Sequence, residues 1–186
     1  MDKRYYMACL DLEGRDCLVV GGGAVGVEKA EGLLECGARV TVVAPQAVAE
    51  LHELQVEWLR RTYRGADLDG RFLVVAATAN NALNRRVHAD AEARSLLCNV
   101  VDVPELCSFM LPAVHRQGPI SIAVSTGGAS PALAQRIRSE LAERIGPEYA
   151  ELARRLQALR PWVKVHYPSY EERRDFFQRL VEDALA

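Results

Sequence analysis

The sequence has no apolar run close to the roughly 20 residues that a membrane-spanning helix needs. Its first six residues, Met1-Asp-Lys-Arg-Tyr-Tyr6, lack the apolar core of a secretory signal. The formal net charge is −2, and no run of five or more lysines and arginines occurs. These absences predict a cytoplasmic protein that binds neither membranes nor nucleic acid.

Cysteine and histidine are few and scattered. The five cysteines form no C-x-x-C motif, and the four histidines show neither H-x-x-x-H nor H-E-x-x-H spacing. An odd number of separated cysteines favours small buried side chains in a reducing compartment over a redox or metal-binding set. We therefore expect no metal site built from protein side chains.

What the sequence does contain is a strand, turn, helix and strand pattern between residues 16 and 45. Residues 17–20 are apolar without alternation, as in a parallel strand covered on both faces. Gly21, Gly23 and Gly26 follow in G-x-G-x-x-G spacing, and a second apolar run occupies residues 40–43. This combination predicts dinucleotide binding, with the start of the intervening helix facing the pyrophosphate. The alternative is a glycine-rich turn that binds no ligand.

Further apolar runs at residues 56–59, 72–77 and 96–101 alternate with helical patterns at 46–53 and 82–95. Asn80 or Asn81 is expected to cap the second of these helices. Such alternation predicts an α/β fold with a Rossmann-type doubly wound parallel sheet over residues 1–107. Ligands of these sheets lie beyond the carboxyl ends of the strands. The loops at 21–26, 44–46, 78–80 and 102–104 should therefore border one crevice.

The acidic residue that commonly bonds the ribose of NAD is absent after the second strand, where Ala44-Pro45-Gln46 stands instead. No arginine replaces it to favour a 2′-phosphate. The residues at this position therefore leave both NAD and NADP open.

Asp102 follows the apolar strand at 96–101 and precedes Val103-Pro104. A carboxylate at the crevice could exchange a proton with a substrate, as a general acid or base does. The alternative is an aspartate that only caps the turn before Pro104, which is a frequent use of this residue type.

After residue 107 the pattern changes. Apolar segments at 109–114 and 120–124, joined by residues 115–119, predict a β-hairpin with His115 solvated in its turn. The loop Ser125-Thr-Gly-Gly-Ala-Ser-Pro131 follows, with Ser130 as N-cap and Pro131 at the first helical position. The loop is either an anion pocket assisted by Arg136 and Arg138, or a flexible turn that only caps the next helix.

The remaining residues, 147–186, are predicted to be helical, with Pro161 and Pro168 as interruptions and Ser169 with Glu172 as a capping box. The last helix is expected to bury Phe177, Leu180, Val181, Ala184 and Leu185. A tail with this many apolar residues must be covered, either by a second subunit or by the chain's own sheet. We thus expect a small α+β dimerisation and substrate segment at 108–146 and a C-terminal helical domain at 147–186.

Several stretches of the chain, taken in order and spacing, resemble the precorrin-2 dehydrogenase family, which occurs alone or fused within siroheme synthases. They include Asn99-Val-Val-Asp102 and Ser125-Thr-Gly-Gly-Ala-Ser-Pro131. The others are residues 21–30, 37–45, 76–78, 83–84, 109–113 and 171–177.

The resemblance implies NAD-dependent oxidation of precorrin-2 to sirohydrochlorin and, in some members, insertion of ferrous iron (Fe2+) into sirohydrochlorin. It also implies an intertwined homodimer, and it places the family's essential aspartate on Asp102. Expected cofactor contacts are Gly21, Gly22, Gly23, Ala24, Val25, Pro45, Gln46 and Thr78. Expected contacts to the substrate's carboxylates are Ser125, Thr126, Gly127, Ser130 and Arg136.

A function of another class also fits a nucleotide-binding fold: a module that senses NAD(H), or carries a tetrapyrrole, without turning it over. Asp102 and the loop at 125–131 are harder to explain in such a sensor. Because no methyltransferase domain accompanies these residues, we do not expect the chain to make precorrin-2 itself.

Overall fold

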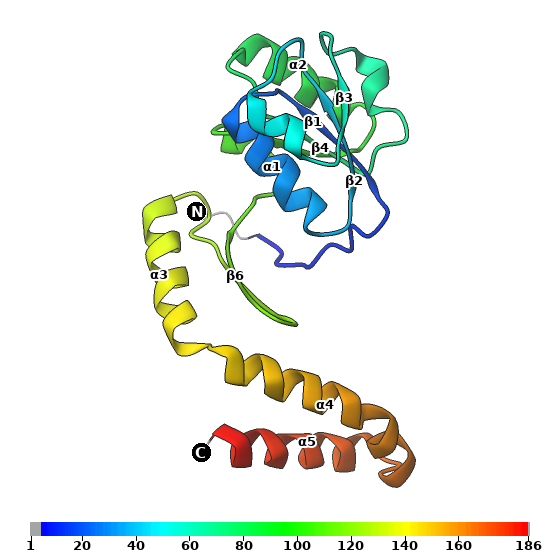
Figure 1. Ribbon diagram of the computed structural model, residues 1–186, viewed down its shortest axis with the longest axis vertical. Helices are drawn as coiled ribbons and strands as arrows, with labels where there is room; N and C mark the ends of the chain where they lie inside the picture. The colour runs from blue at the N-terminus through cyan, green and yellow to red at the C-terminus, as the bar shows by residue number, and fades with distance from the viewer. Residues whose placement is uncertain (1–4, 186) are drawn as a thin grey trace. The chain divides into compact units, whose positions relative to one another are not determined.

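A five-stranded parallel sheet forms the centre of residues 6–111, one of two units into which the chain divides (Figure 1). The computed structural model describes residues 5–185. The strand order is β3-β2-β1-β4-β5, as expected for a doubly wound sheet. The strands are β1 (Asp16–Val20), β2 (Arg39–Val43), β3 (Glu57–Leu59), β4 (Leu73–Ala76) and β5 (Leu97–Val100).

Helices cover both faces of this sheet, which explains why its strands are apolar on both sides. Helix α1 (Ala24–Leu34) packs with Val19, Val42 and Val75 on one face. Helix α2 (Asn81–Glu92) packs with Leu18, Val74 and Cys98 on the other face. The predicted Rossmann-type architecture is therefore confirmed.

Two predicted helices of this unit have different limits in the structure. Of residues 46–53 only η1 (Ala49–Glu53) is helical, as a short 3-10 turn. Helix α2 ends at Glu92, before the predicted Ser95, because Ser95 takes a positive φ of 53° and the Leu96 N–H turns back to the Ala91 carbonyl.

The polar segment at residues 64–70 contains another 3-10 turn, η2 (Gly65–Leu68), whose buried Asp67 forms an ion pair with Arg61. Arg61 donates to both Asp67 carboxylate oxygens, at 2.9 and 2.6 Å, and the Arg64 N–H donates to Asp67 at 2.8 Å. Burial acts to raise the pKa of Asp67, but these hydrogen bonds outweigh it and hold the pKa below its usual range.

We expect Asp67→Asn to lower the free energy of unfolding by about 1–3 kcal/mol at pH 7, since it leaves the Arg61 guanidinium without its carboxylate. A lowered folded-state pKa stabilises the fold above the unfolded value of about 3.9, and this stabilisation is lost as the pH falls through the folded value. The difference between wild type and variant should therefore narrow below about pH 4 in urea titrations. Asp69→Asn, which alters an exposed carboxylate of the same segment, is the control. An equal loss of unfolding free energy in both variants would contradict a specific stabilising role of the Arg61–Asp67 ion pair.

The second unit contains a two-stranded antiparallel hairpin and three helices. Its strands β6 (Ala113–Gln117) and β7 (Ile120–Val124) are joined by Gly118-Pro119, with Gly118 at a positive φ of 56°. The predicted first strand begins four residues too early, because Phe109 belongs to residues 6–111 and packs against the core of their sheet. His115 therefore lies in β6 and not in the turn, with its Nε2 3.2 Å from the Ile145 carbonyl oxygen.

Helices α3 (Pro131–Arg144), α4 (Pro147–His166) and α5 (Tyr170–Leu185) follow. The prediction that Pro161 interrupts the chain is wrong, because α4 continues through it. An interior proline removes one helical hydrogen bond, but the residues after it are held by packing: Val163 is fully buried and Trp162 contacts Phe176 of α5. Pro168 does separate α4 from α5, and Ser169 and Glu172 form the predicted capping box.

Helices α4 and α5 lie side by side as a helical hairpin (Figure 1). The prediction that α5 buries five apolar side chains is wrong for the single chain: Phe177, Leu180 and Val181 are half-buried, and Ala184 and Leu185 are exposed. One neighbouring helix covers only one side of α5. Helix α3 is similar, since Leu133 is 51% exposed. None of the described helices is long and apolar enough to cross a membrane.

Candidate dinucleotide and catalytic site

The glycine-rich loop after β1 is held tightly against neighbouring strand ends. Gly21 has a φ of +125°, which side chains rarely tolerate, and a Cβ there would collide with the Ala77 carbonyl. Its N–H donates to the Val43 carbonyl at 3.0 Å. A Cβ on Gly26 would collide with the Gly21 carbonyl, so α1 can begin this close to the sheet only with glycine there. These two glycines are therefore required by the packing of the loop itself.

Gly23 differs from its neighbours because nothing lies within 4 Å of where its Cβ would be. It is the N-cap of α1, it has an ordinary extended φ of −80°, and Ala24 and Val25 after it are exposed. A glycine cap has no side chain to bond the first helical N–H groups, which consequently point to open space. The three residues fit a pyrophosphate, which helix N-termini bind through such groups.

The loop after β2 is fixed by a residue that the sequence patterns did not single out. Trp58 of β3 donates its indole N–H to the Ala44 carbonyl at 3.0 Å, and the Val48 N–H donates to Gly22 at 2.9 Å. These bonds join the loop to the glycine turn and leave Pro45 and Gln46 exposed beside it. The sequence signal was a tryptophan in a short edge strand, which is ambiguous because tryptophan serves equally well in a core.

The loop after β4 is fixed by buried Asn84 of α2. The Thr78 hydroxyl donates to Asn84 Oδ1 at 2.7 Å, and Asn84 Nδ2 donates to the Thr78 carbonyl at 2.9 Å. Asn80 caps α2 as predicted, accepting from the Leu83 N–H at 3.0 Å. The Thr78 hydroxyl is thus engaged within its own loop, and its contact with the cofactor stays a prediction.

We expect Asn84→Leu to raise the dissociation constant for NAD several-fold, since the Thr78 loop loses its hydrogen bonds to the Asn84 side chain. The free energy of unfolding should fall by about 1–3 kcal/mol because polar groups of the loop stay buried without partners. NADH fluorescence titration and urea unfolding measure the two effects. Asn81→Ala, an exposed neighbour on the same helix, is the control. Unchanged NAD binding in Asn84→Leu would show that the loop does not touch the cofactor.

Asp102 lies at the carboxyl end of β5, next to the end of β4. The Val101 N–H donates to the Ala76 carbonyl at 3.0 Å, and the Val103 N–H donates to the Val100 carbonyl at 3.2 Å, closing a tight turn. Asp102 has a positive φ of 61° in this turn, and its side chain is exposed. Across residues 5–185, no hydrogen bond or ion pair involves its carboxylate. The turn before Pro104 that the alternative interpretation requires is therefore present, but the Asp102 carboxylate does not cap it.

The predicted substrate residues belong to the second unit. Ser125, Thr126, Gly127 and Ser130 share the loop between β7 and α3. Thr126 Oγ1 accepts from the Ser130 N–H at 3.0 Å and donates to the Ser130 carbonyl at 3.1 Å. Ser130 caps α3 as predicted, accepting from Leu133 at 3.2 Å. Arg136 is largely exposed and pairs with Glu140 at 2.6 Å. The loop is consequently closed by its own hydrogen bonds.

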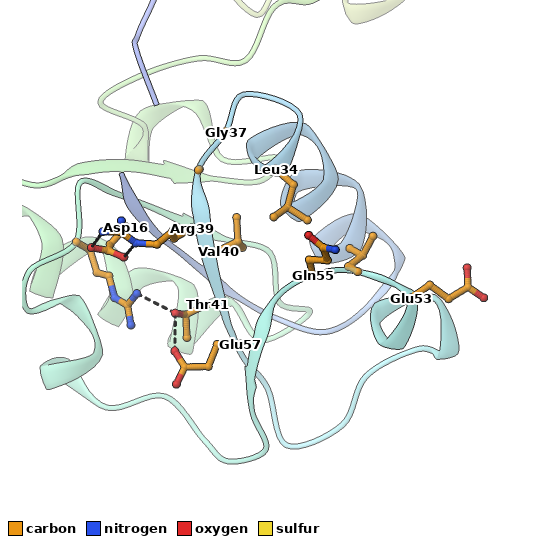
Figure 2. A pocket seen from close by; sticks show the side chains of 12 residues that line it. Asp16, Leu34, Gly37, Arg39, Val40, Thr41, Glu53, Gln55 and Glu57 are labelled. Carbon is orange, nitrogen blue, oxygen red and sulfur yellow. Dashed lines mark hydrogen bonds and ion pairs between the residues drawn. The ribbon is translucent and has the colours of Figure 1, made fainter. Parts of the chain in front are cut away.

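A cavity of about 680 Å³ lies away from this crevice, at the amino ends of β1 and β2. Figure 2 shows Arg39 paired with Asp16, and Thr41 hydrogen-bonded to Glu57. Arg71, which also lines it, donates to Thr41 at 2.8 Å. Because parallel sheets bind ligands at the carboxyl ends of their strands, opposite this cavity, it is not the dinucleotide site.

Family models match nearly the whole chain in three consecutive parts. Residues 8–113 match NAD_binding_7, an NAD(P)-binding family, and residues 117–144 match the sirohaem biosynthesis protein central family. Residues 148–186 match the sirohaem synthase dimerisation region. The first match covers the unit that carries the glycine loop and Asp102.

Individual relatives agree with these families. The chain is 43% identical over 182 residues to the siroheme synthase of Thioalkalivibrio sulfidiphilus and 42% identical over 179 residues to that of Pseudomonas entomophila. These alignments cover 96% and 94% of this chain but 37% and 39% of the relatives, so it spans under two fifths of their length.

A solved structure, that of SirC, a precorrin-2 dehydrogenase, has a TM-score of 0.81 and 31% identity to this chain. The match covers 98% of this chain and 93% of SirC. The chain therefore belongs to the family that comprises the precorrin-2 dehydrogenases and the corresponding part of the siroheme synthases.

Proposed function

We propose that the chain oxidises precorrin-2 to sirohydrochlorin with NAD as the hydride acceptor. The observation that carries this proposal is the exposed, unpaired carboxylate of Asp102. It follows the carboxyl end of β5, and the glycine loop follows the carboxyl end of β1 in the same parallel sheet. An NAD(P)-binding family match and the likeness to SirC support it.

In this proposal the N–H groups of Gly22, Gly23, Ala24 and Val25 bind the pyrophosphate, Gly21 shapes the turn, and Pro45 and Gln46 border the ribose. The Thr78 loop borders the same crevice. When bound, NAD accepts a hydride from the macrocycle.

The oxidation removes two hydrogens from the substrate, one as the hydride and the other as a proton. We assign the proton to the carboxylate of Asp102, which no other described side chain engages. A positioned base of this kind typically contributes about 10²–10⁴-fold to a rate.

The loop at 125–131 and Arg136 are proposed to bind the carboxylates of the tetrapyrrole. Because the hydroxyls of Thr126 and Ser130 serve the loop itself, its backbone N–H groups and the arginine are the stronger candidates. The ion pair of Arg136 with Glu140 is exposed and worth only about 0–1 kcal/mol. A substrate carboxylate can therefore replace Glu140 at little cost.

Insertion of ferrous iron into sirohydrochlorin is proposed for the same crevice, with Asp102 accepting the pyrrole protons. In the described part of the chain, no three His, Cys, Asp or Glu side chains are grouped as metal ligands. In this proposal iron is a substrate that is delivered to the macrocycle.

A homodimer is proposed from the match of residues 148–186 to a dimerisation region and from the exposed apolar side chains of this unit, including Leu133, Trp162, Val165 and Tyr170. We propose the cytoplasm as its location, because the cysteines of the sequence are odd in number and form no C-x-x-C motif, a pattern that favours a reducing compartment.

The test is anaerobic incubation of the full chain with precorrin-2 and NAD, following NADH absorbance and the spectrum of sirohydrochlorin together. Stoichiometric appearance of both is expected. A chain that binds NADH but yields neither product would instead be a sensor or carrier. A parallel reaction with sirohydrochlorin and ferrous iron tests the second step by the formation of siroheme.

A further inference from the structure

We propose that Cys107 is a positioning residue for Asp102: its thiol holds both ends of the turn that presents the carboxylate. This inference rests on the proposed function, since it assigns a role in the reaction to a side chain outside the crevice. It depends on the geometry of residues 98–109 alone.

The turn needs such support because Asp102 occupies an unfavourable conformation. Val100 and Val103 are joined by the 3.2 Å hydrogen bond that closes a four-residue turn, and Asp102 is its third residue, with φ of +61°. Turns with a positive φ at this position favour glycine or asparagine there. An aspartate in the left-handed region persists only where surrounding contacts impose that conformation.

The thiol of Cys107 supplies these contacts. Its Sγ accepts from the Val100 N–H at 3.2 Å and lies 3.2 Å from the Val100 carbonyl oxygen. The Val103 carbonyl oxygen is 3.3 Å from the same sulfur. A thiol is both a weak donor and a weak acceptor, so one side chain bonds the first and the last residue of the turn.

The thiol is in turn held against the sheet. Asn99, which is 7% exposed, donates to the Phe109 carbonyl at 2.9 Å and approaches Cys107 Sγ at 3.5 Å. The Ser108 N–H donates to the Cys98 carbonyl at 2.8 Å, and the Cys98 N–H donates to Ser108 Oγ at 2.8 Å. Because β5 is the edge strand of its sheet, no further strand pairs with its outer side. These bonds take the place of such pairing and fix residues 107–109 along the outer side of β5.

The consequence is a rigid path from the sheet to the carboxylate. If the thiol is removed, Asp102 can relax from positive to negative φ, which turns its side chain away from its present direction. A misplaced catalytic group of this kind lowers the rate of the chemical step while leaving the remote cofactor loop unchanged.

The test compares Cys107→Ala, Cys107→Ser and Cys98→Ala in the full chain. Cys107→Ala is expected to lower kcat by about 10- to 100-fold with an unchanged dissociation constant for NADH. Cys107→Ser should recover most of kcat, because a hydroxyl also donates and accepts. Cys98→Ala is the control, since it removes a buried thiol of β5 whose sulfur makes no hydrogen bond to the turn in the described residues.

Hydrogen exchange provides a readout that does not depend on activity. The amides of Val100 and Val103 should exchange faster in Cys107→Ala than in wild type or Cys98→Ala. Equal exchange, or equal kcat losses in Cys107→Ala and Cys98→Ala, would overturn the inference. If wild type itself makes no NADH, the proposed function fails, while exchange still shows whether the thiol holds the turn.

Discussion

Asp102→Ala is expected to lower kcat for NADH formation by about 100-fold or more, because it removes the group proposed to accept the substrate's proton. The loss should appear in kcat and not in the affinity for NADH, since the glycine loop is unchanged. Steady-state kinetics with precorrin-2 and a separate NADH titration distinguish the two.

Asp102→Gly separates the loss of activity from any loss of stability. Glycine adopts positive φ freely, so this variant should be as stable as wild type or more stable by about 1 kcal/mol. It should nevertheless be as inactive as Asp102→Ala. Loss of activity together with retained or increased stability would identify the strained aspartate as a functional residue.

The control is Glu105→Gln, which neutralises an exposed carboxylate three residues away in η3 (Pro104–Leu106). It should retain nearly full activity. Full activity in Asp102→Gly would remove Asp102 from the mechanism, and equal losses in Glu105→Gln would point to the charge of the whole loop instead.

Gly23→Val is expected to weaken NAD binding by roughly 100-fold without unfolding the protein. The open space around Gly23 accommodates a side chain, and its φ of −80° is ordinary for any residue. That side chain would occupy the place proposed for the pyrophosphate. Losing two charge-assisted hydrogen bonds of about 1.5 kcal/mol each corresponds to about 100-fold in affinity.

Two other glycines of α1 provide matched comparisons. Gly32→Ala, at a position with equally open surroundings, should bind NAD normally and gain about 0.5–1 kcal/mol of stability. Gly26→Ala should instead destabilise the protein, because its Cβ would collide with the Gly21 carbonyl. NADH titration and thermal unfolding measured on all three variants test the distinction. Normal binding in Gly23→Val would place the pyrophosphate elsewhere.

Sequence patterns were most successful where one local rule decides the structure. The apolar run of β1, the glycine spacing after it and the N-caps Asn80 and Ser130 all depend on neighbours within a few residues. The position of Asp102 at a strand end followed from the same alternation. Its left-handed backbone could not be predicted, because positive φ at a non-glycine residue is imposed by surrounding contacts.

Errors arose where distant contacts compete with local preference. The sequence predicts Phe109 in the hairpin, but Phe109 belongs to residues 6–111 and packs against the core of their sheet. Pro161 was expected to interrupt a helix, but packing around Val163 and Trp162 keeps α4 continuous. The apolar face of α5 is half-buried or exposed among the described residues, and the second subunit predicted as its cover stays a prediction.

The sequence by itself therefore determined the parallel sheet, the glycine loop and the place of Asp102 at the end of a strand, because strand pattern and glycine spacing act over short distances. Only the tertiary structure decided how that residue is presented. Cys107, Asn84 and Trp58 act through hydrogen bonds to backbone carbonyls of other loops, at 3.3, 2.9 and 3.0 Å. Such bonds form only when the tertiary fold brings the side chain next to the carbonyl of another loop, and the hydrophobic pattern of the sequence does not encode that.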